Sequence, residues 1–123
     1  MDDRDLLEHA RKAAEEAHAP YSGFQVGAAV LARDGRVVTG ANVESSSYGL
    51  TLCAERAALA RAVAEGVRPG DVEAVAVTAS PCGACRQWLV DFAVGRVLFP
   101  WQGELVERRP DELLPDSFRL DVS

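Results

Sequence analysis

The spacing of apolar residues predicts four helices. Leu6, Ala10, Ala13 and Ala17 recur every three or four residues, which is typical of a helix with one buried face, and Pro20 closes this segment. The next helix is rich in alanine and is stopped by a glycine, which favours the C-terminal end of a helix. The other three helices are expected over residues 51–65, 81–92 and, as a short closing turn, 111–114.

Five other segments have the alternating or buried apolar pattern of strands. Asp34 and Gly35 form a hairpin signal between the first two strands, because both residues tolerate a positive φ. Gln102 and Gly103 mark a second turn, before the last strand. The strands are expected over residues 25–33, 36–44, 72–78, 96–100 and 104–108.

The order of these elements predicts an α/β fold. A helix is followed by a hairpin, and then by units in which strands alternate with helices. This order favours one mixed five-stranded sheet that is flanked by helices. The chain has 123 residues, which is the usual size of one domain, so we expect a single domain over residues 1–123.

Composition and charge narrow the class of protein. Apolar residues make up 48% of the chain and charged residues 26%, as in ordinary globular proteins, and no apolar run is long enough to span a membrane. The first residues are acidic, unlike a secretory signal, so we expect a cytoplasmic protein. The net charge is −6, and the excess acid lies in residues 1–16 and 104–121. No basic stripe is present for a nucleic acid, and neither nucleic acid nor membrane is an expected partner.

Three cysteines carry the first indication of chemistry. An odd number of cysteines in a reducing compartment favours metal binding or catalysis over disulfides. Cys82 and Cys85 lie three residues apart on one face of a predicted helix, close enough to share a metal ion. This pair alone would also fit a redox motif or two buried thiols. Cys53 also lies at a predicted helix start, so that two helix N-termini could converge on one cation.

Three thiolates leave one tetrahedral position of a zinc ion open to water, which is typical of catalytic rather than structural zinc. The alternative fourth ligand is His9 or His18. Both lie in the predicted N-terminal helix and neither has a second ligand at metal-binding spacing, so we expect them to have surface or packing roles. Arg56 or Arg86 is expected to donate to a sulfur and to moderate the negative charge of the three thiolates, with ordinary salt bridging as the alternative.

Glu55 is the candidate catalytic residue. Two residues that are two apart in a regular helix differ by about 200° in direction, so Cys53 and Glu55 can face one ion only if Cys53 is the non-helical cap. The carboxylate would then stand beside a metal-bound water without being a ligand. Zinc lowers the pKa of its water to about 7, and a nearby carboxylate can move the proton to a leaving group. A glutamate that only stabilises the helix N-terminus is the alternative.

These residues match the arrangement of zinc nucleobase deaminases, in which a His or Cys is followed by x-Glu and later by Pro-Cys-x-x-Cys. From about Ala19 to Phe118 the sequence resembles the small, three-cysteine cytidine deaminases. The motifs that carry this resemblance are Ala19-Pro20-Tyr21-Ser22, Phe24-Gln25-Val26-Gly27-Ala28-Ala29, Asn42-Val43-Glu44, Cys53-Ala54-Glu55-Arg56, Pro81-Cys82-Gly83-Ala84-Cys85-Arg86-Gln87 and Glu112-Leu113-Leu114-Pro115.

The resemblance implies a three-layer fold, one zinc ion per chain, and hydrolysis of free cytidine and 2′-deoxycytidine to uridine, 2′-deoxyuridine and ammonia in pyrimidine salvage. It also implies a homotetramer with shared active sites. Asn42 and Glu44, which share a strand face, would bind the ribose hydroxyls. The other implied substrate contacts are Phe24 on the pyrimidine face, the Ala54 N–H and Cys82 carbonyl on the base edge, and Tyr48 and Phe118 at a neighbouring chain's site.

The sequence departs from the family pattern in two places. Only Ala79 and Ser80 separate the third strand from Pro81, where relatives carry a longer loop, and the tail after Phe118 is short. Three alternatives are a deaminase of another amino-pyrimidine nucleoside, such as a blasticidin-like antibiotic, a non-catalytic zinc-stabilised binding protein, and a polynucleotide editor. The Phe24 segment and the Asn42-x-Glu44 pair favour a plain ribonucleoside, the intact Glu55 disfavours a non-catalytic protein, and the acidic ends disfavour editing.

Overall fold

A mixed five-stranded sheet forms the centre of the protein, as the sequence predicts. The structure, a computed structural model, describes residues 1–120, so residues 121–123 of the expected domain lie outside the described residues. The strand order is β2-β1-β3-β4-β5, and the β3–β4 pair is parallel whereas the other pairs are antiparallel. The strands are β1 (Gly27–Ala32), β2 (Val37–Ala41), β3 (Val72–Val77), β4 (Arg96–Trp101) and β5 (Glu104–Arg108).

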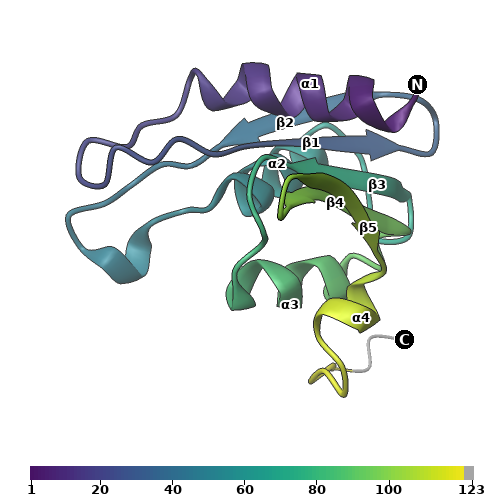
Figure 1. The fold of residues 1–123 in the computed structure, drawn as a ribbon. Helices are drawn as coiled ribbons and strands as arrows, with labels where there is room; N and C mark the ends of the chain where they lie inside the picture. Colours follow the sequence, from purple (N-terminus) through teal and green to yellow (C-terminus); the bar gives the residue numbers. More distant parts are fainter. Residues whose placement is uncertain (121–123) are drawn as a thin grey trace.

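Helices cover both faces of this sheet and make three layers (Figure 1). The α1 helix lies on one face, whereas α2 and α3 lie on the other. Among the described residues, no helix is long and apolar enough to cross a membrane. The helices are α1 (Asp3–Ala14), the short 3-10 helix η1 (Tyr48–Leu50), α2 (Ala54–Ala64), α3 (Gly83–Asp91) and α4 (Pro110–Leu113).

The strand β1 is buried on both faces and divides the core in two. Its side chains alternate between the faces, as successive side chains in a strand must. Ala29 and Leu31 pack in the cluster that contains α1, whereas Ala28, Val30 and Ala32 pack in the cluster that contains α2 and α3. The small side chains of β1 let helices approach the sheet closely from both sides.

Each predicted helix and strand is present, with shifted ends. The Asp2 side chain accepts a hydrogen bond from the Asp5 N–H at 2.9 Å, and α1 begins at Asp3. It ends at Ala14, so Ala17 and His18, which the sequence placed in this helix, lie beyond its end. The predicted second strand, 36–44, ends at Ala41. Asn42 and Glu44, which the sequence placed on one face of this strand, therefore follow the strand and are not part of it. The predicted helices 51–65 and 81–92 begin later, at residues 54 and 83, because the backbone just before each is extended.

The glycine in β2 sets the distance between this strand and α2. A Cβ atom on Gly40 would lie 2.4 Å from the Ala58 nitrogen, 2.8 Å from the Ala58 Cα atom and 2.9 Å from the Ala54 oxygen. These are backbone atoms that a side chain rearrangement cannot move away. Only glycine at this position lets the first turns of α2 lie against the sheet.

We therefore expect Gly40→Ala to lower the free energy of unfolding by about 3 kcal/mol, at the upper end of the usual cost of overpacking. Urea denaturation of the purified proteins measures this loss. Gly49→Ala is the matched control, because a Cβ there meets no atom within 4 Å, and its effect should stay below about 0.5 kcal/mol. Equal stability losses for the two variants would contradict the close approach of α2 to β2.

Candidate functional site

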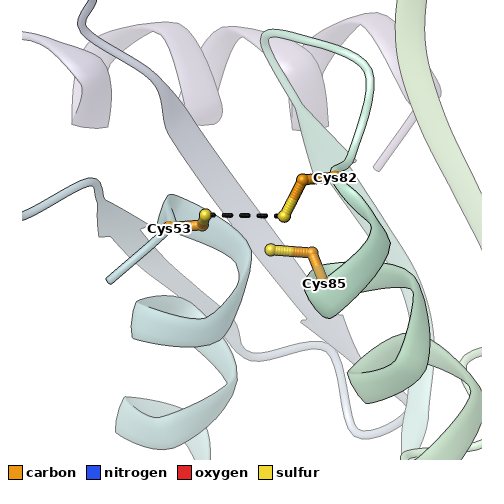
Figure 2. Close-up of side chains that lie close together, drawn as sticks. All are labelled: Cys53, Cys82 and Cys85. Carbon is orange, nitrogen blue, oxygen red and sulfur yellow. Dashed lines mark hydrogen bonds between the residues drawn. The ribbon is translucent and has the colours of Figure 1, made fainter. Parts of the chain in front are cut away.

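The three cysteines converge at the N-termini of two helices (Figure 2). Cys53 is the N-cap residue of α2, Cys82 is the N-cap residue of α3, and Cys85 lies in the first turns of α3. Their Sγ atoms all lie within 4.8 Å of one another, and those of Cys53 and Cys82 are 3.7 Å apart. All three thiols are free of disulfides. They could therefore hold a single metal ion between the helices.

The sheet topology explains why these two helices start side by side. The β2 and β3 strands are both antiparallel to β1 and so run in the same direction. Their carboxyl ends lie at the same edge of the sheet, and the segments that lead into α2 and α3 leave from that edge. The backbones of Cys53 and Cys82 are extended, and neither side chain makes a capping hydrogen bond, so both thiols point toward the shared space (Figure 2).

The electrostatics of the cluster favour a cation. Hydrogen bonds from the Cys85 thiol, and next from Arg56 and Cys82, lower the pKa of the Cys53 thiol from 9.0 to about 5, against the opposing effect of burial. The hydrogen bond to Cys53 and burial raise the pKa of the Cys85 thiol well above its usual range. A divalent cation would supply the charge that lets all three thiols ionise. Three clustered cysteine sulfurs are a donor set that suits zinc.

Arg56 and Arg86 are the two arginines that the sequence predicted as hydrogen-bond donors to a cysteine sulfur, and only Arg56 makes such a hydrogen bond. Its Nη2 atom donates to the Cys53 Sγ atom at 3.3 Å and to the Thr51 carbonyl at 3.3 Å. Arg86 donates instead to the carbonyls of Pro81 at 2.9 Å and Leu113 at 3.0 Å. It therefore fixes the segment before α3 and joins it to α4, a role that sequence reasoning missed because Leu113 is distant along the chain.

Glu55 is buried in the first turn of α2, next to the cysteine cluster. Its side chain is only 3% exposed, and Asn42 is the only other buried polar or charged residue among those the structure describes. Burial, together with the nearby Cys53 thiolate, raises the pKa of the Glu55 carboxyl above 4.5. Because Cys53 has the non-helical conformation of a cap (φ −73°, ψ 156°), the geometric condition for Glu55 to stand beside the cluster is met.

The side chains of Asn42 and Glu44 hold the loop that carries Phe24. The Asn42 side chain accepts from the Val26 N–H at 2.8 Å and donates to the Phe24 carbonyl at 2.9 Å. Glu44 accepts from the N–H groups of Tyr21 and Ser22 through its Oε1 atom, at 3.0 and 3.1 Å, and from the Ser22 hydroxyl through its Oε2 atom. The sequence indicated neither set of contacts, because they join segments about 20 residues apart.

The remaining candidate substrate-binding residues differ in how exposed they are to solvent. Phe24 is 62% exposed, Tyr48 is 80% exposed and Phe118 is 71% exposed, so all three present aromatic surface outside this chain's core. Ala54 is buried as the first residue of α2. Its N–H is one of the helix-terminal donors that have no partner within the helix. Cys82 uses its carbonyl for the Arg86 N–H at 2.9 Å, which leaves one acceptor site. The histidines do not belong to the cysteine cluster.

Comparison with known proteins gives consistent results. Residues 1–100 match the family model of the cytidine and deoxycytidylate deaminase zinc-binding region. The cytidine deaminase of Halalkalibacterium halodurans is 48% identical to this chain over 98% of the chain and 97% of that protein. The crystal structure of the cytidine deaminase from Burkholderia pseudomallei is 44% identical, covers 96% of this chain and 100% of its own, and has a TM-score of 0.89. That from Mycobacterium tuberculosis is also 44% identical, covers 98% and 99%, and has a TM-score of 0.84.

Proposed function

The chain belongs to the cytidine and deoxycytidylate deaminase family, and from this premise we propose that it hydrolyses free cytidine and 2′-deoxycytidine to uridine and 2′-deoxyuridine. One observation carries this proposal. The buried Glu55 carboxyl lies in the first turn of the helix that Cys53 caps, where the sulfurs of Cys82 and Cys85 also converge. The comparisons do not favour deamination of a blasticidin-like nucleoside or a non-catalytic binding role.

In this proposal Cys53, Cys82 and Cys85 hold one zinc ion per chain. Zinc with three protein ligands keeps a fourth position for water and lowers the pKa of that water to about 7. Arg56 assists by donating a hydrogen bond to the Cys53 sulfur, which partly offsets the charge of three thiolates. The three free thiols are suited to a reducing compartment, and we assign the reaction to the cytoplasm for that reason.

Glu55 is the proposed proton carrier. Its carboxylate takes a proton from the attacking water and delivers it to N3 of the pyrimidine while the hydroxide adds to C4. The same side chain then moves the hydroxyl proton to the amino group, which leaves as ammonia as the carbonyl of uridine forms. A buried carboxyl with a raised pKa is suited to this task, because it exchanges a proton more readily near neutral pH than an exposed one.

The substrate would lie between the Phe24 loop and the start of α2. The Phe24 ring is proposed to cover the pyrimidine, and the Ala54 N–H and Cys82 carbonyl are proposed to bond its edge. Asn42 and Glu44, which both follow the end of β2 at Ala41, would bind the ribose hydroxyls. The hydrogen bonds of Asn42 and Glu44 to the loop support this assignment. They hold the two proposed sugar-binding side chains next to the loop that carries Phe24, the proposed base contact.

We further propose that four chains assemble and complete each other's sites. The exposed aromatic side chains of Tyr48 and Phe118 would reach a neighbouring pocket, which accounts for large apolar groups on the surface of a single chain. Sedimentation equilibrium of the purified protein should then give four times the chain mass of 13.2 kDa. A monomer that is fully active would contradict shared sites.

The proposed activity is tested by ammonia release from free cytidine, with the zinc content measured on the same sample. We expect turnover with about one zinc per chain. Zinc without turnover on cytidine or 2′-deoxycytidine would contradict the substrate assignment, and a panel of modified pyrimidine nucleosides would then be assayed. A folded, active protein without zinc would contradict the role of the cysteines.

Glu55→Gln tests the proton carrier, because the amide has almost the same shape but cannot take up a proton. We expect kcat for cytidine to fall by about 10²–10⁴-fold, the usual contribution of general acid–base catalysis, while the zinc content stays at the wild-type level. Zinc analysis of each sample is the control for an intact metal centre. Near-normal kcat with bound zinc would contradict this mechanism.

A further inference from the structure

The hydroxyl of Ser22 joins the two parts of the proposed nucleoside pocket. Its Oγ atom contacts the Oε2 atom of Glu44, the proposed sugar ligand. On its other side, the same oxygen lies 3.0 Å from the backbone nitrogen of Phe24, whose ring is the proposed base contact. No role was assigned to Ser22 by the sequence.

The chemistry of these groups fixes the direction of both hydrogen bonds. A backbone N–H can only donate, so the Ser22 oxygen accepts from Phe24. An ionised carboxylate can only accept, so the single proton of the Ser22 hydroxyl is directed at Glu44. The hydroxyl therefore has a defined orientation, and it ties the Glu44 side chain to the backbone that carries Phe24.

The carboxylate of Glu44 keeps one acceptor position after these contacts. A carboxylate offers about four lone-pair sites. The N–H groups of Tyr21 and Ser22 use Oε1, and the Ser22 hydroxyl uses one site of Oε2. The remaining site on Oε2 can accept from one further donor, and a sugar hydroxyl is a donor of that kind. Its direction is set by the three contacts that hold the carboxylate.

We propose that Ser22 is a positioning residue that fixes the Glu44 carboxylate for a ribose hydroxyl. This inference rests on the proposed function, in which Glu44 binds the sugar. Ser22 would make no contact with the substrate, and its effect would pass through Glu44. The consequence is a preference for nucleosides that carry the ribose hydroxyls.

The variant Ser22→Ala removes the hydroxyl, whereas Ser22→Thr keeps it. For cytidine we expect Ser22→Ala to lower kcat/KM about tenfold, mainly through KM, because a sugar contact is made equally in the ground and transition states. For 2′,3′-dideoxycytidine, which lacks both ring hydroxyls, the loss should be below about twofold. Ser22→Thr should restore kcat/KM for cytidine to within about threefold of wild type.

Ser45→Ala is a matched control, because the Ser45 hydroxyl also accepts from a backbone N–H two residues on, that of Ser47 at 3.1 Å, but is not bonded to Glu44. Its effect should be the same on cytidine and on 2′,3′-dideoxycytidine. Equal losses on the two substrates in Ser22→Ala would show a general loop effect and overturn the proposal. An unchanged kcat/KM for cytidine in Ser22→Ala would also overturn it.

A second readout does not depend on activity. The side-chain hydrogen bond from Ser22 is the largest cause that lowers the pKa of the Glu44 carboxyl, followed by the N–H groups of Ser22 and Tyr21 and the charge of His18. In Ser22→Ala the NMR-detected pKa of Glu44 should rise toward 4.5, and Ser22→Thr should reverse this. An unchanged pKa would overturn the proposal. Failure of the wild-type chain to deaminate cytidine would instead count against the proposed function.

Discussion

The structure depends on bringing three ionisable sulfurs together at the N-termini of two helices. Thiols that must share negative charge repel one another as they ionise, so their positions have to be fixed by the surrounding fold. Because β2 and β3 run in the same direction, α2 and α3 both begin near the same edge of the sheet. The close approach at Gly40 lets α2 pack directly against β2. Arg56 then donates to the Cys53 sulfur and offsets part of the charge. The packing of α2 therefore places the cysteine sulfurs, and the hydrogen bond from Arg56 offsets part of their charge.

Burial of Glu55 supports the proposed chemical use of this cluster. A carboxyl that is 3% exposed loses hydration, and burial raises its pKa, which is a cost that packing alone does not require. The cost is explained if the group moves protons, because its position in the first turn of α2 puts it beside the sulfurs without making it a fourth ligand. In the proposed function, the exposed Phe24 ring provides the surface on which the base lies. Asn42 and Glu44 hold the loop that carries Phe24 next to the end of β2.

Much of this could be predicted from the sequence, because it follows from local patterns. The hydrophobic spacing identified each α-helix and strand but not the short η1 helix, and the Asp34 and Gly35 turn predicted the hairpin, where Gly35 has a φ of +96°. The geometry of a helix cap also required Cys53 to be extended if it shared a site with Glu55. The ends of the elements were predicted less accurately, because each end depends on the contacts of a single residue, such as the hydrogen bond that the Asp2 side chain accepts at the start of α1. Contacts between distant segments, such as Ser22 with Glu44 and Arg86 with Leu113, leave no periodic signal in the sequence and needed the structure.

The most direct test of the account is the coordination of the metal in the purified protein, measured by zinc-edge X-ray absorption. We expect one zinc per chain with three sulfur neighbours at about 2.3 Å and one lighter ligand at about 2.0 Å, the open position at which water can be activated. Four protein ligands, or a histidine in place of one of the three sulfurs, would contradict the account. Such a result would leave no open position beside Glu55, or would place that position elsewhere.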